Sequence, residues 1–198
     1  MSKAPEQFGT GSEEGIVASE AANNATVGGA LNATATIGSM TDTGALTVAG
    51  TTTLVTSADD ATITLDQGGH AFTGALLITT NDSGTDTAGD VTISAGSGAA
   101  LDFGNSTIDG DLIATSSNAT GITDSGALTV RGTSSFQTTA THADIILDVG
   151  HAITGKVTLN TTGSGGVANL DNGTTAIVLG TSAASIATSV GGNLNLKT

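Results

Sequence analysis

The sequence of 198 residues contains no cysteine, tryptophan or tyrosine, and its one proline is Pro5. Without cysteine the chain can form neither a disulfide nor a thiolate metal site. After residue 5, no proline interrupts the pairing of β-strands. Aromatic residues are limited to Phe8, Phe72, Phe103 and Phe136. We therefore expect a core of Val, Ile, Leu and Ala packed in thin layers, in which small aliphatic side chains stack.

Positive charge is equally scarce, with four Lys and Arg against 18 Asp and Glu, and the formal net charge is −14 at pH 7. The four cations, Lys3, Arg131, Lys156 and Lys197, are scattered along the chain. Because phosphate binding needs clustered Lys and Arg, this pattern argues against nucleic acid as a partner. The sequence shows no long apolar run and no signal peptide, so we predict no membrane insertion.

All four glutamates lie within the first twenty residues, whereas every later acidic residue is an aspartate. This change in composition marks residues 1–22 as a separate N-terminal cap or leader segment. Two structures are open for it: a short helix with Ser12 as its N-cap, or a leader strand laid over the first coil of the adjoining domain. We predict that the remaining residues, 23–198, form a single repetitive domain.

Repetition is the main feature that the chain does have. TDTGALTVAGT at 41–51 returns 82 positions later as TDSGALTVRGT at 123–133, with nine of eleven residues identical. One of the two changes replaces Ala49 by Arg131, so we expect this position to face water. A repeat of this length indicates the overall architecture, so it has to be recognised before individual strands or helices are assigned.

Other segments return at the same spacing. VGGAL, which ends at Leu31, returns as IDGDL and then as VGGNL, which ends at Leu194. TLDQGGHAFTG returns with one deletion as ILDVGHAITG, which pairs His70 with His151. These spacings divide the chain into a first unit at 27–108, a second unit at 109–190, and the start of a third at 191–198.

Within each unit, runs of four to nine residues alternate between apolar and polar side chains and stop at Gly, Asp, Asn or Ser, which is typical of short β-strands. A long repeat of such strands predicts an all-β fold, a parallel β-solenoid. At roughly 20 residues per coil, each unit has about four coils and the chain about eight, in a rod roughly 40 Å long. The predicted inward positions are Leu46, Val48, Leu54, Ile63, Leu65, Leu77, Val91, Ile93, Leu112, Leu128, Val130, Ile145, Leu147, Val157, Leu159, Ile177, Leu179 and Leu194.

Through GALTVxGT, HAxTG and VGGNLxL, residues 27–198 resemble the repeat arrays of filamentous-haemagglutinin-like bacterial adhesins, also described as β-strand-repeat proteins. The resemblance implies a right-handed parallel β-helix that is secreted and holds the chain away from the cell surface. It also implies an extracellular location and a host or cell-surface receptor as a possible partner. The secretion domain of that family is missing from this sequence.

No pattern of residues predicts a cofactor or a catalytic site. His70 and His151 are repeat mates about four coils apart, too distant to share a metal ion, so we expect them to form corners or stacking contacts. Aspartates are expected mainly in turns, and the loop holding Asp82, Asp86 and Asp90 is a weak candidate for calcium. With four dispersed cations and no Trp or Tyr, a polysaccharide-active enzyme is disfavoured. The threonine pairs are too irregularly spaced to favour an ice-binding protein.

The ends of the solenoid are the features most closely tied to function, because an uncapped coil exposes unpaired backbone. The chain is therefore expected to be a structural protein of an extracellular bacterial surface or matrix, a β-helical fibre that self-assembles head to tail. A stalk fragment of a large secreted adhesin is the main alternative, and ice-binding and polysaccharide-active β-helices are further ones. The residues assigned to the assembling ends are Val27, Gly28, Gly29, Leu31, Val190, Gly191, Gly192, Asn193, Leu194 and Leu196.

Overall fold

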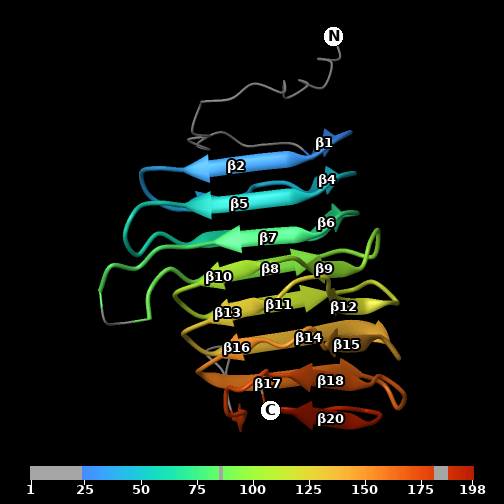
Figure 1. Ribbon diagram of the computed structural model, residues 1–198. Coiled ribbons are helices and arrows are strands. Elements are labelled where there is room, and N and C mark those ends of the chain that lie inside the picture. Colours follow the sequence, from blue (N-terminus) through green and yellow to red (C-terminus); the bar gives the residue numbers. More distant parts are fainter. Residues whose placement is uncertain (1–23, 85–86, 181–186) are drawn as a thin grey trace.

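The computed structural model describes residues 24–84, 87–180 and 187–198, and every regular element within them is a β-strand. All pairings between these strands are parallel, and paired strands lie one turn apart along the chain. Successive turns therefore stack into a rod (Figure 1). The prediction of an all-β parallel β-solenoid is confirmed, while the expected cap at 1–22 lies outside the described residues.

The strands form two extended sheets. The nine-stranded sheet contains β1 (Ala25–Val27), β3 (Met40–Thr41), β4 (Leu46–Val48), β6 (Ile63–Phe72), β8 (Val91–Ala95), β11 (Leu112–Ser116), β14 (Ser134–Thr141), β17 (Lys156–Thr162) and β19 (Val178–Leu179). The eleven-stranded sheet contains β2 (Leu31–Ala35), β5 (Thr52–Thr56), β7 (Leu76–Thr79), β9 (Leu101–Phe103), β10 (Ser106–Ile108), β12 (Gly121–Asp124), β13 (Leu128–Val130), β15 (Asp144–Leu147), β16 (Ala152–Ile153), β18 (Ala168–Asp171) and β20 (Leu194–Lys197). Over the described ranges, no helix is long and apolar enough to cross a membrane.

Each turn of the solenoid contains more residues than the roughly 20 predicted. Ala25 pairs with Leu46, 21 residues later, and Ile63 pairs with Val91, 28 residues later. The corners between strands take up more residues than an estimate from strand lengths allows. The chain consequently makes about seven turns, and the predicted eight was too many.

The repeat does not coincide with a whole number of turns. Strand β4 pairs with the end of β6, where His70 lies, and His70 then pairs with Ala95, Ala95 with Ser116, and Ser116 with Thr138. Each pairing advances the chain by one turn, so the third turn after β4 ends at Ser116. The counterpart of β4 is β13, which lies further along the same turn and belongs to the other sheet. The 82-residue unit therefore covers three turns and part of a fourth, slightly fewer than the predicted number of about four.

The core consists of columns of inward side chains, one residue from each turn. In one column Leu65, Ile93, Ala114, Phe136 and Leu159 are paired in that order, and all of them are buried. Alternate residues of each strand point outward, which is the period of two expected for strands. Burial of each large aliphatic side chain contributes roughly 1.5–3 kcal/mol, so the columns are the main source of stability.

The expectation of a core without aromatic residues was wrong. Phe72, Phe103 and Phe136 are fully buried and are the largest side chains of the interior. The rings of Phe103 and Phe136 meet edge to face, with centroids 6.3 Å apart and an interplanar angle of 83°. Space for the Phe136 ring exists because its neighbour in the preceding turn is the small Ala114.

Most of the predicted inward positions are buried. The exceptions are the half-buried Leu46, Leu77 and Ile177 and the exposed Leu179 and Leu194. Leu77 is only half-buried, and its neighbours Leu76 and Ile78 are buried instead, because the run of three apolar residues hides which of them face inward. Leu179 and Leu194 are 41% and 38% exposed, respectively, because they lie on the last described turn.

Candidate functional site

His70 is buried, and its ring joins two turns of the solenoid. Its Nδ1 accepts a hydrogen bond from the backbone N–H of Leu46 at 2.9 Å, so Nδ1 is the unprotonated nitrogen. Nε2 lies 2.8 Å from Oδ2 of Asp42, at an angle too bent for an ideal hydrogen bond. The ring also stacks on Phe72, with centroids 5.6 Å apart. We call the His–Asp–backbone contact a histidine clip.

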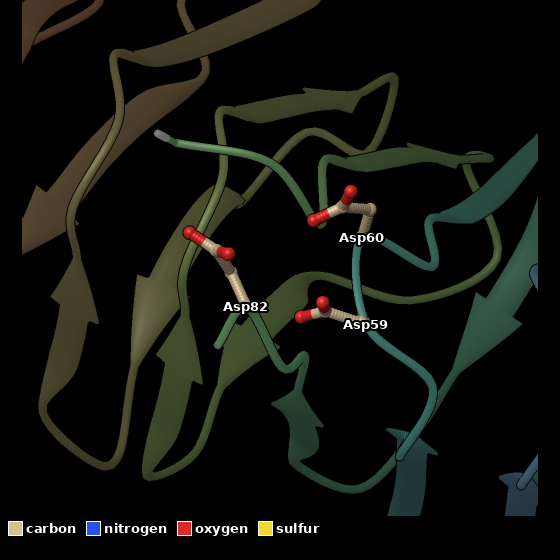
Figure 2. A group of neighbouring side chains, drawn as sticks. All are labelled: Asp59, Asp60 and Asp82. Carbon is tan, nitrogen blue, oxygen red and sulfur yellow. The ribbon is translucent and has the colours of Figure 1, made fainter. Parts of the chain in front are cut away.

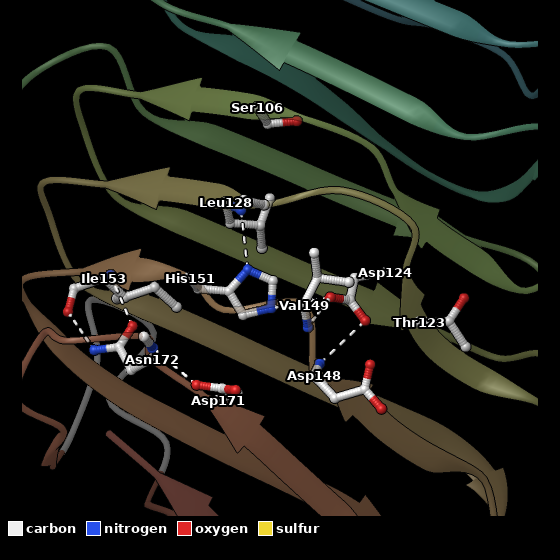
Figure 3. Close-up of polar contacts among 12 residues, drawn as sticks. Ser106, Thr123, Asp124, Leu128, Asp148, Val149, His151, Ile153, Asp171 and Asn172 are labelled. Atoms are coloured by element: carbon white, nitrogen blue, oxygen red, sulfur yellow. Dashed lines mark hydrogen bonds and ion pairs between the residues drawn. The ribbon is translucent and has the colours of Figure 1, made fainter.

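The second repeat builds the same clip around His151 (Figure 3). Nδ1 of His151 accepts the N–H of Leu128 at 2.9 Å, and Nε2 lies 3.2 Å from Oδ2 of Asp124. The Asp124 carboxylate also accepts the N–H groups of Asp148 at 3.2 Å and Val149 at 2.9 Å. In both clips the hydrogen bond accepted by Nδ1 links the histidine to a strand of the preceding turn.

Sequence reasoning paired the histidines with each other and missed their aspartate partners. Asp42 and His70 are 28 residues apart, and that separation has no meaning until the length of a turn is known. A usable signal was present, because the Asp at the start of each GALTV segment returns together with its His in both repeats.

The aspartates of the weak calcium candidate do not act as one loop. Asp86 lies outside the described residues. Asp90 accepts the N–H of Asp111 at 2.8 Å through its Oδ1. Asp82 instead lies close to Asp59 and Asp60 of the preceding turn (Figure 2). One carboxylate oxygen from each of the three residues lies within 4.8 Å of the other two. We call these three residues the acidic corner.

The N-terminal residues assigned to assembly lie on the first described turn. β1 ends at Val27 and pairs only with β4 in the described part of the chain, and β2 begins at Leu31 and pairs there only with β5. Gly28 and Gly29 form the exposed turn between these two strands. Strands β1 and β2 therefore each have one edge without a strand partner among the described residues.

The C-terminal residues lie on the last described turn, at the opposite end of the rod (Figure 1). Val190 is half-buried, and Gly191, Gly192 and Asn193 form an exposed turn. Gly192 donates its N–H to the carbonyl of Gly166, which fixes this turn on the one before it. Strand β20 pairs with β18 and, over the described ranges, with no other strand, so Leu194 and Leu196 remain 38% and 41% exposed.

A family model for repeats of unknown function (DUF5649) matches residues 16–79 and 88–160. The chain belongs to the DUF5649 repeat family. Both histidine clips fall within the matched segments, one in each. The comparisons found no match among curated proteins or among solved structures. Membership of the DUF5649 family thus supports the repetitive β-solenoid and assigns it no activity, and its name makes no link to haemagglutinin-like adhesins.

The clips of this DUF5649 protein should make its stability depend on pH. Burial lowers the pKa of His70 and His151 below the ordinary 6.5, against the opposing effect of the Asp42 and Asp124 carboxylates. The unfolded chain then binds more protons than the folded one below that value, so stability is lost as the pH falls from 6.5 through the folded pKa values.

Melting temperatures followed by circular dichroism between about pH 7.5 and 5.5 will test this dependence. The wild type should lose stability with falling pH, and the H70Q/H151Q variant, which cannot titrate at these positions, should show a flatter profile. Equal slopes for the two proteins would contradict the role of the histidines.

Proposed function

We propose that the chain is a structural protein, a stiff β-solenoid rod of an extracellular bacterial surface whose copies join end to end. The observation that carries the proposal is the edge of β20 that has no strand partner in the described part of the chain. There the inward-facing Leu194 and Leu196 cover Ala168 and Leu170 and remain partly exposed themselves. An unpaired strand edge beside exposed leucines is a template for another strand.

The first turn of a second copy suits this edge. β2 and β20 occupy corresponding places in the repeat and both begin with Leu-Asn. Parallel pairing in register would place Leu31 beside Leu194 and Asn32 beside Asn195. The amide of Asn195 already donates to that of Asn169 at 2.6 Å, so Asn32 would extend an existing ladder of stacked amides. A contact of this head-to-tail kind continues into open filaments.

The resemblance to haemagglutinin-like arrays supports both the extracellular location and a second candidate function, a stalk segment of a secreted adhesin that presents a receptor-binding part. In that case the β20 edge is covered by further turns of the same polypeptide. The two candidates differ in what the chain does alone: the first polymerises and the second stays monomeric.

The deciding experiment is negative-stain microscopy with size-exclusion chromatography of the purified chain. We expect unbranched fibres from the wild type and a folded monomer from L194K/L196K, because two buried ammonium groups would oppose the end contact. V149K is the matched control, since Val149 is 49% exposed at a corner on a middle turn and should leave fibres intact. A wild type that stays monomeric at all concentrations, or fibres from L194K/L196K, would rule out assembly through β20.

A further inference from the structure

The acidic corner brings three carboxylate groups close together. Asp59, Asp60 and Asp82 come from two consecutive turns, and one carboxylate oxygen of each lies within 4.8 Å of the other two (Figure 2). Asp82 is 8% exposed, and its buried Oδ2 has no hydrogen-bond partner among the described residues. The nearest positive charge recorded for Asp82 is the Arg131 guanidinium, 3.7 Å from that oxygen. Like charges this close repel one another, so a cation held between the carboxylates would relieve the repulsion.

The second repeat shows that the corner itself does not need these acids. Asp60 and its counterpart His142 both adopt left-handed backbone conformations, with φ of 60° and 65°. The Asp60 N–H donates to the carbonyl of Asn81 at 3.2 Å, and the His142 N–H donates to that of Thr162, the counterpart of Asn81, at 2.9 Å. The same corner is thus closed by the same backbone contact in both copies.

None of the three carboxylates is retained in that second copy. Thr141 stands in place of Asp59, His142 in place of Asp60, and Gly163 in place of Asp82. Because the corner forms with these residues, a purely structural role does not explain why three acids meet in the first repeat.

We propose that Asp59, Asp60 and Asp82 bind a calcium ion in the first repeat. Clustered carboxylate oxygens are the ligands that calcium prefers, and water can complete its six to eight positions. Hydrogen bonds from the backbone and hydroxyl of Ser83, at 2.6 and 2.8 Å, hold the Asp59 carboxylate in place.

Arg131 would compete with the calcium ion for the Asp82 carboxylate. Its guanidinium lies 3.7 Å from Oδ2 of Asp82, beyond hydrogen-bonding distance, and 3.5 Å from Oδ1 of Asp109. The Arg131 side chain is 42% exposed, so it can move away from Asp82 and keep Asp109 as its partner. Removal of this positive charge should strengthen calcium binding.

Calorimetric titration of the purified full chain with calcium chloride tests the proposal, and circular dichroism follows thermal unfolding, since there is no Trp or Tyr to report it. We expect one ion per chain and a rise in melting temperature with calcium. The D59T/D60H/D82G variant installs the residues of the second repeat, so it should fold and lose binding entirely. D148N, which removes an exposed acid elsewhere, is the control for charge and should bind as the wild type does.

The R131A variant should instead bind calcium severalfold more tightly than the wild type. The proposal is overturned if the wild type binds no calcium up to about 10 mM, above the range of extracellular calcium modules. It is also overturned if D59T/D60H/D82G binds as well as the wild type, or if R131A loses binding. None of these outcomes depends on whether the chain forms fibres.

Discussion

Replacement of Phe136 by alanine is expected to lower the free energy of unfolding by about 3–5 kcal/mol. The ring is fully buried in the middle of β14, between Ala114 and Leu159 of the adjacent turns, and packs edge to face on Phe103. Ala114 has no side chain long enough to fill the space, so the substitution leaves a cavity in addition to losing buried apolar area. In a solenoid each turn contacts only its neighbours, so the loss of stability should be greatest in the central turns of the rod.

Urea unfolding followed by far-ultraviolet circular dichroism measures the effect. Phe136→Leu should cost roughly a third as much, because most of the volume is kept. Thr129→Ala, at an exposed position of β13, should change the midpoint little. A loss below about 1 kcal/mol for Phe136→Ala would mean that the core column collapses around the cavity.

The Asn172→Leu variant is expected to lose a similar amount, about 3–5 kcal/mol, for a different reason. Asn172 is fully buried, and its side-chain amide takes the place of a strand beside β16 (Figure 3). Its Oδ1 accepts the N–H of Ile153 at 2.9 Å, and its Nδ2 donates to the carbonyl of Ile153 at 2.9 Å and to that of Thr175 at 3.1 Å. Leucine has a similar size and leaves these buried backbone groups without partners.

The matched control is Asn169→Leu, because Asn169 lies half-buried on β18 and its amide oxygen accepts a hydrogen bond from the exposed Asn195 side chain. This control should lose less than about 1 kcal/mol in the same urea titration. Equal losses for the two variants would show that the amide of Asn172 is not specifically required.

The fold was predictable because its signals are local and repeated. Alternation along segments such as Ile63–Leu65 places strands, and the recurrence of GALTV requires a stacked architecture. Which residues face inward could not be predicted where several apolar residues follow one another, as around Leu77. The number of turns was not predictable, since corners vary in length, and one turn takes 21 residues at Ala25 and 28 at Ile63.

The sites were less predictable for the same reason. Contacts such as Asp42–His70 and Asp59–Asp82 join residues one turn apart, and their separations in sequence depend on the corners between them. The acidic loop was recognised through Asp82, but its partners were sought further along the chain instead of one turn back. Asn172, which replaces a strand by a side chain, had no pattern that distinguishes it from an ordinary turn residue.

Because the repeat unit ends partway through a turn, counterpart groups are displayed around the circumference of the rod and not along one side. The clip of His70 joins β4 and β6 of one sheet, whereas that of His151 lies beside β13 and β16 of the other. The same displacement separates Ala49 from Arg131 and the acidic corner from its uncharged copy. A flat partner lying along the rod would therefore meet any given feature in one copy only, and avidity through matching copies would require a partner that winds around the axis.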